Sequence, residues 1–207
     1  RWGRVEETYG EDPYLIAEMG IGFVKGYQKH RITCTPKHFV AHGTPTGGLN
    51  CAFVSGGERE FRSMHLYPFA RVIKEADPLC IMSCYSAYDG IPVSASPYYM
   101  TDVLRDELGF KGYVYSDWGA IEMLKTLHYT AHNSEEAAMQ AFTAGLDVEA
   151  SSNCYPLLAD LIKEGKLDEE ILNESVRRVL YVKFKMGLFE DPYGERYAHC
   201  KMHPQEG

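Results

Sequence analysis

Chemically capable side chains gather at the ends of three apolar, strand-like runs of the sequence. They are an amine, an imidazole, a phenol, a carboxylate and an indole, carried by Lys37, His38, Tyr85, Asp117 and Trp118. In a parallel α/β sheet the carboxyl ends of the strands share one face, so these side chains are expected around one pocket. Amines and imidazoles donate hydrogen bonds to hydroxyl groups, and an indole stacks on the C–H face of a sugar ring. The set therefore favours a polyhydroxylated, uncharged ligand.

Each of these residues also has a purely structural interpretation. Asp117 would serve equally as the cap of a helix predicted over residues 119–127. Lys37 would be an ordinary solvated lysine, and His38 and Tyr85 would be satisfied members of the core. The repeated position at strand ends favours a functional site.

Two pairs of histidines lie four positions apart, the spacing that brings metal ligands together on a helix: His38 with His42, and His128 with His132. The first pair falls on a strand and the loop after it, and the second lacks the glutamate of a zincin motif. No Cys-x-x-Cys pair and no nucleotide-binding glycine motif occurs. We therefore expect neither metal nor cofactor, with a metal-dependent hydrolase using His38 and His42 as an alternative.

Hydrophobic periodicity predicts four strand-then-helix units that would hold these residues. The predicted strands are 32–41, 78–85, 113–115 and 145–149, and the helices are 13–28, 58–76 with a kink at Pro68, 96–108, 119–127, 134–144, 156–164 and 168–186. Such alternation indicates a parallel sheet with right-handed crossovers. Four units are half of an eight-stranded barrel, so the chain forms either a complete open sheet or part of a larger barrel.

The first helix has the clearest start signal, with Asp12 as the N-cap and Pro13 at its first position. Its apolar residues are predicted to lie together on the face that meets the core: Leu15, Ile16, Met19, Phe23 and Val24.

The composition and net charge of the chain exclude some classes of binding partner. The 207 residues carry a net charge of −8 without a basic cluster, so neither nucleic acid nor a membrane surface is an expected partner. No apolar run approaches the roughly 20 residues needed to span a membrane. The chain has no targeting signal and starts on arginine rather than methionine, which suggests that it begins inside a longer gene product.

Several short motifs appear in a fixed order along nearly the whole chain. They are Arg1–Arg4 with Glu7 and Gly10–Pro13, Lys37–Phe39, Arg59 with Arg62 and His65–Phe69, Met82–Tyr85 with Asp89–Pro92, Leu104–Gly112, Ser116–Trp118, Gly145–Asp147, Arg177–Leu180, and Lys185 with Gly187–Phe189. In this order they resemble the barrel domain of glycoside hydrolase family 3, the β-glucosidase and β-xylosidase group. Each motif alone is weak, and the ordered set is specific.

The resemblance implies an α/β fold, a (β/α)8 TIM-like barrel of which this chain covers roughly the C-terminal two-thirds. Residues 1–193 would form the partial barrel domain, and 194–207 would begin a linker to a following domain. It implies a retaining, exo-acting β-glycosidase for terminal glucosyl or xylosyl residues of β-linked oligosaccharides or aryl glycosides, and the remaining segments of its own protein as a partner. No cofactor is implied, and the oligomeric state is left open.

The resemblance also implies roles for individual residues. Asp117 would be the catalytic nucleophile, and Arg4, Lys37 and His38 would bind hydroxyls of the sugar in the −1 subsite. Tyr85 would lie close to the nucleophile, and Trp118 beside the sugar. A retaining mechanism also needs a second carboxyl group about 5 Å away as acid/base. In β-glucosidase-like members that glutamate belongs to a later domain, so it is expected outside this chain.

Two alternatives accompany this interpretation. A bacterial β-N-acetylglucosaminidase branch of the family carries an Asp-His pair in the loop after the Lys-His-Phe motif, whereas residues 42–48 contain no aspartate here. A non-catalytic carbohydrate-binding or scaffold barrel would account for the absent acid/base. Plant-polymer β-glycosidases of this kind are often exported, so a periplasmic or secreted location is expected.

Overall fold

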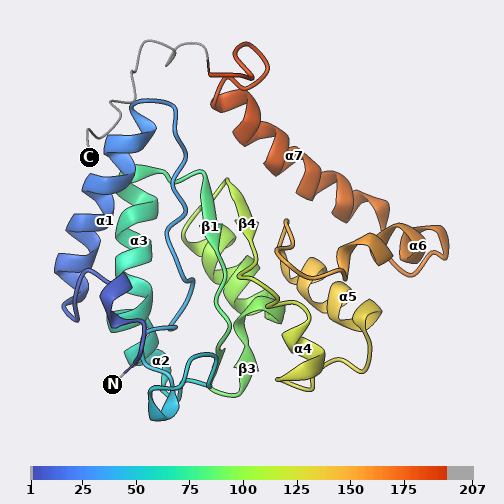
Figure 1. Cartoon of the computed structure of the whole chain (residues 1–207), viewed down its shortest axis with the longest axis horizontal. Coiled ribbons are helices and arrows are strands. Elements are labelled where there is room, and N and C mark those ends of the chain that lie inside the picture. Colours follow the sequence, from blue (N-terminus) through green and yellow to red (C-terminus); the bar gives the residue numbers. More distant parts are fainter. Residues whose placement is uncertain (1, 195–207) are drawn as a thin grey trace, which may run out of the picture.

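The computed structural model describes residues 2–194, and its centre is a short parallel sheet (Figure 1). Strand β1 (Cys80–Met82) pairs with β4 (Tyr113–Tyr115), with Ile81 opposite Val114. One further bridge extends this pair on each side, Phe39 with Ser83 and Tyr115 with Val148. Four parallel segments therefore lie side by side in the order of the chain, and their parallel pairing agrees with the predicted sheet.

Helical segments follow or separate these strands. They are η1 (Val5–Glu7), α1 (Pro13–Gln28), η2 (Thr46–Gly48), α2 (Glu58–Glu60), η3 (Phe61–Leu66), α3 (Tyr67–Ala76), η4 (Val93–Ala95), η5 (Tyr98–Glu107), α4 (Met123–Thr126), α5 (Ser134–Ala144), η6 (Tyr155–Leu157), α6 (Leu158–Lys163) and α7 (Glu169–Lys185). A small hairpin, β2 (Ala87–Tyr88) with β3 (Ile91–Pro92), was not predicted. Helices α1 and α3 lie on one side of the strands and α5 to α7 on the other (Figure 1). No helix of the described part is long and apolar enough to cross a membrane.

The helix starts follow the predicted capping chemistry. The side chain of Asp12 accepts hydrogen bonds from Tyr14 N and Leu15 N, and those of Asn133 and Asp168 cap α5 and α7 in the same way. The predicted break at Pro68 is also present, because the π-helical turns of η3 end just before it and α3 begins there.

The predicted inner face of α1 is correct for Val24, which is buried, and wrong for its larger residues. Leu15, Met19 and Phe23 are each 48% exposed, whereas the helix buries Ala17, Ile21 and Val24. The small residues on that buried side let α1 approach α3 closely: a Cβ at Gly20 would lie 2.9 Å from Val72 Cγ2. Close backbone approach therefore selects the face with the smaller side chains, while the larger apolar residues stay outside.

The two outer strands are shorter than predicted. Only Phe39 of the segment 32–41 and only Val148 of 145–149 pair with a neighbour. Each of these segments has a hydrogen-bonding neighbour on one side only among the described residues, which shortens the ladder. The parallel sheet is open in this part of the chain, and most of the predicted linker, residues 195–207, lies outside the described residues.

Candidate active site

Asp117 stands at the mouth of the sheet, two residues after β4, and is 6% exposed. Backbone contacts to the neighbouring segment fix this corner: Ser116 N donates to Val148 O at 2.9 Å and Gly119 N to Ala150 O at 2.8 Å. Ser116 Oγ in turn accepts from Ala150 N at 2.8 Å. The strand end is therefore pinned on both sides of the carboxylate.

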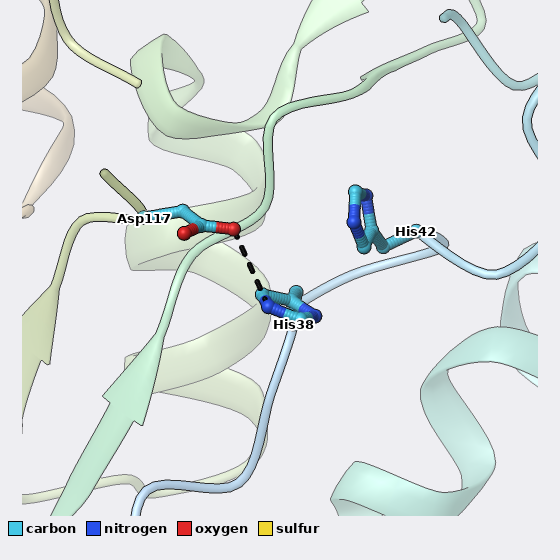
Figure 2. Close-up of side chains that lie close together, drawn as sticks. All are labelled: His38, His42 and Asp117. Atoms are coloured by element: carbon cyan, nitrogen blue, oxygen red, sulfur yellow. Dashed lines mark ion pairs between the residues drawn. The ribbon is translucent and has the colours of Figure 1, made fainter. Parts of the chain in front are cut away.

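The two carboxylate oxygens of Asp117 differ. Oδ1 accepts a hydrogen bond from Trp118 N at 2.8 Å. Oδ2 is buried and makes no hydrogen bond within the described residues, and His38 Nε2 lies 3.3 Å from it. Figure 2 shows the carboxylate turned toward His38, with the ring of His42 beyond. One oxygen is thus held, and the other is available to a ligand.

His38 and His42 lie on either side of Phe39, the residue that pairs with Ser83 at the sheet edge, and both are buried. Their rings lie 4.6 Å apart, and Arg4 reaches both, at 3.1 Å from His38 Nε2 and 3.2 Å from His42 Nε2. Burial, followed by the neighbouring His42, lowers the pKa of His38 to about 3. Burial, followed by Arg4, lowers the pKa of His42 to about 4. Both imidazoles are therefore neutral at neutral pH.

Arg4 is held in place by Glu7 through two charge-assisted hydrogen bonds, Nε to Oε1 at 2.7 Å and Nη2 to Oε2 at 2.8 Å. These bonds lower the pKa of Glu7 to about 2. Lys37 Nζ also lies 3.6 Å from Glu7 Oε2, so one carboxylate links both predicted sugar-binding cations. The arginine and the lysine thus meet at one carboxylate.

Tyr85 and Trp118 are the two aromatic residues predicted for the site. The Tyr85 ring lies 5.8 Å from that of His42, and burial, followed by the charge of Asp117, raises the pKa of the phenol. Tyr85 is therefore a protonated donor beside the carboxylate. Trp118 is 66% exposed and lies at the rim, where an indole can stack on a bound ring.

The structure gathers all the predicted site residues, Arg4, Lys37, His38, Tyr85, Asp117 and Trp118, around one mouth of the sheet. It adds Glu7 to them and places His42 against Arg4. The three-residue spacing of Arg4 and Glu7 was a signal for that ion pair, since such residues are neighbours on a helical turn. No sequence signal places His42 against Arg4, because that contact joins segments 38 residues apart.

Ligand atoms of His38, His42 and Asp117 all lie within 4.8 Å of one another, which is close enough for a metal ion. The guanidinium of Arg4, however, donates toward the Nε2 atom of both histidines. A cation bound there would lie against that positive charge, so the donor set suits hydroxyl groups better than a metal.

Comparisons with known proteins show the family of this chain. The sequence profile described as "Glycosyl hydrolase family 3 N terminal domain" matches residues 1–182, and the chain belongs to this family. A protein named "Beta-xylosidase" from Formosa agariphila is 35% identical over 92% of this chain and 28% of its own length. The "Lysosomal beta glucosidase" of Dictyostelium discoideum is 37% identical over 93% of this chain and 25% of its own.

Solved structures give the same result for the fold. A crystal structure of a β-glucosidase from Listeria innocua in complex with glucose matches with a TM-score of 0.89 and 40% identity, over 93% of this chain and 28% of that one. A β-glucosidase from Erythrobacter marinus matches with a TM-score of 0.90 and 37% identity, over 92% and 26%. The chain thus spans between 25% and 28% of the length of these relatives.

Proposed function

We propose that this chain supplies the nucleophile half of a retaining, exo-acting β-glycosidase that releases terminal β-D-glucosyl or β-D-xylosyl residues. The observation that carries the proposal is Asp117 Oδ2, a buried carboxylate oxygen without a hydrogen bond in the described residues, at the mouth of a parallel sheet. Several relatives are named as β-glucosidases or β-xylosidases, which supports the same activity.

The mechanism follows from the two oxygens of this carboxylate. Oδ1 stays bonded to Trp118 N, which fixes the rotamer, while Oδ2 attacks the anomeric carbon. The bond to the leaving oxygen breaks as a carboxylic acid from outside the described residues protonates that oxygen. Water, deprotonated by the same group, then attacks the anomeric carbon of the glycosyl-aspartate and releases Asp117, and the sugar leaves with its original configuration.

The surrounding side chains bind the sugar in the proposed site. Arg4 and Lys37, both joined to Glu7, donate to ring hydroxyls, and neutral His38 exchanges hydrogen bonds with them. His38 Nε2 accepts from Arg4 and lies 3.3 Å from Asp117 Oδ2, so it holds the guanidinium next to the nucleophile. Tyr85 donates from the opposite side, and Trp118 covers the rim. The expected substrates are β-linked oligosaccharides and aryl β-glycosides.

We also propose that residues 1–193 belong to a (β/α)8 barrel closed by other segments of a longer protein, with 194–207 beginning a linker. The outer strand segments at Phe39 and Val148 each have one sheet neighbour among the described residues. Helices α1 and α7 also expose apolar side chains, including Phe23 and Phe184. Closing the barrel would pair the edges and cover these faces.

A periplasmic or secreted location is part of the proposal. It rests on the names of two relatives, the "Periplasmic beta-glucosidase" of Salmonella typhimurium and the lysosomal enzyme of Dictyostelium discoideum. Fractionation of the native organism with an antibody against this chain tests it.

The activity is tested with the full-length protein on p-nitrophenyl β-glucoside and β-xyloside, with proton NMR of the first sugar released. We expect the β-anomer to appear first and the α-anomer only by later mutarotation. Initial release of the α-anomer would exclude the retaining mechanism. No release from either substrate, with saturable sugar binding retained, would favour a carbohydrate-binding barrel instead.

A further inference from the structure

His128 contacts the candidate site from a segment to which neither the sequence motifs nor the proposed mechanism gives a role. Its Nε2 lies 2.8 Å from the main-chain carbonyl oxygen of Tyr85, 43 residues away in the chain. A carbonyl oxygen only accepts, so Nε2 must carry the hydrogen. Burial lowers the pKa of His128, which keeps the ring neutral. In the neutral ring, the bond to Tyr85 O fixes the tautomer with the hydrogen on Nε2.

The segment that carries His128 is tied to Asp117 by a continuous series of backbone hydrogen bonds. Ala120 N donates to Asp117 O at 3.0 Å, Met123 N to Gly119 O at 3.0 Å, and His128 N to Met123 O at 2.8 Å. Leu124, fully buried, anchors this short helix in the core. The imidazole therefore projects from a unit whose other end is the nucleophile.

The segment that carries Tyr85 leaves the sheet at this point. Ser83 N still donates to Tyr115 O at 2.9 Å and Cys84 N to Phe39 O at 2.8 Å, so both are held by neighbouring strands. Tyr85 is the next residue, and the side chain of His128 holds its carbonyl. The phenol of Tyr85 faces Asp117, whose charge contributes to its raised pKa.

We propose that His128 is a positioning residue for Tyr85: its bond to the Tyr85 carbonyl locks the loop after β1 to the loop after β4 and so sets the phenol against Asp117. The proposal rests on the function proposed above. The bond completes a series of contacts that runs from Asp117 through α4 to His128 and on to Tyr85. His128 therefore affects the reaction only by placing the phenol of Tyr85.

The test is a double-mutant cycle in the full-length enzyme, with His128→Phe, Tyr85→Phe and the pair. The measured quantity is kcat/KM for 2,4-dinitrophenyl β-glucoside, whose leaving group needs no proton, so that the rate reports attack by Asp117. Each rate is divided by the fraction of protein that a 2-fluoro glycoside labels, which removes misfolded protein from the comparison. His132→Phe, at an exposed histidine of the same region, is the matched control.

We expect His128→Phe to lower kcat/KM at least tenfold, and less than twofold when Tyr85 is already phenylalanine. His128→Gln, which places an amide N–H where Nε2 lies, is expected within threefold of the wild type, and His132→Phe unchanged. Equal losses in both Tyr85 backgrounds, or a glutamine variant as impaired as the phenylalanine one, would overturn the proposal. A wild-type enzyme that neither labels nor hydrolyses would instead contradict the proposed function itself.

Discussion

Two aspartates lie on adjoining segments of the sheet, both are buried, and their carboxylates differ in the hydrogen bonds that they accept. Asp117 is 6% and Asp147 7% exposed. Asp147 Oδ2 accepts from Arg105 Nη2 at 2.7 Å and from Val114 N at 2.8 Å. Its Oδ1 accepts from Arg178 Nη1 at 2.9 Å. Asp117 has one oxygen bonded to Trp118 N and one without a hydrogen bond in the described residues.

The difference separates a structural carboxylate from a reactive one. Asp147 joins η5, β4 and α7 through its bonds to Arg105, Val114 and Arg178, so its charge is fully compensated. Asp117 is surrounded instead by neutral histidines, with the cation of Arg4 behind them. Burial alone does not identify a nucleophile. A buried carboxylate oxygen that accepts no hydrogen bond from the protein is the more informative feature.

The largest expected effect comes from Asp117→Asn in the full-length enzyme. The amide still accepts from Trp118 N, but it does not attack the anomeric carbon, so kcat should fall by at least about 10³-fold. The melting temperature should stay the same or rise, since a buried charge without a full set of partners is removed. Hydrolysis assays and thermal unfolding measure the two quantities, and an active variant would contradict the role of Asp117.

Asp147→Asn is expected to do the reverse. It leaves Arg105 and Arg178 without their counter-charge, which should lower the free energy of unfolding by about 3–5 kcal/mol. The folded fraction should keep a kcat close to that of the wild type, because Asp147 takes no part in the proposed reaction. Urea titration measures the stability, and hydrolysis assays normalised to folded protein measure kcat. A loss of kcat without a loss of stability would contradict the structural role of Asp147.

The surroundings of the two carboxylates should also differ in pH dependence. Since folding lowers the pKa of His38 to about 3 and of His42 to about 4, the unfolded chain binds more protons than the folded one below about pH 6.5. Their contribution to stability is therefore complete above that pH and is lost as pH falls toward 4, by up to about 1.4 kcal/mol per unit for each histidine.

The variant His42→Gln isolates this pH effect, because the amide oxygen can still accept from Arg4 and the group does not titrate. We expect a shallower decrease in unfolding free energy between pH 6.5 and 4.5, measured by urea titration at several pH values. Asp147 is paired with arginines that stay charged throughout this range, so Arg178→Gln should leave the slope unchanged. Identical slopes in the wild type and His42→Gln would contradict the assignment of buried neutral imidazoles.

The smallest effect on activity and stability is expected for a substitution of Trp118, at the rim of the candidate site. Trp118→Ala removes an exposed indole, so the free energy of unfolding should change by less than about 0.5 kcal/mol. Loss of a stacking contact of about 1 kcal/mol should raise KM for an aryl glycoside about fivefold. Steady-state kinetics measure it, and an unchanged KM would remove Trp118 from the substrate site.

The sequence was sufficient for the parallel pairing of the strands, the helix caps and the position of Asp117 at a strand end. These features depend on residues that are close in the chain: Asp12 is the N-cap of α1, and Asp117 comes two residues after β4. The exposed face of α1 was not predictable, because close packing on α3 outweighed the spacing of the larger apolar residues. Nor were the contacts of Arg4 with His42 and of His128 with Tyr85, which join distant segments.

The most direct test of Asp117 as nucleophile is the intact mass of the full-length protein after incubation with 2,4-dinitrophenyl 2-deoxy-2-fluoro-β-glucoside, followed by peptide mapping. The electronegative fluorine slows hydrolysis of the intermediate, so the sugar stays attached. We expect one fluorosugar per molecule, on the peptide containing Tyr115 to Trp118 and on Asp117 itself. A label on Asp147 or another carboxylate, or an active enzyme that takes up no label, would contradict the account.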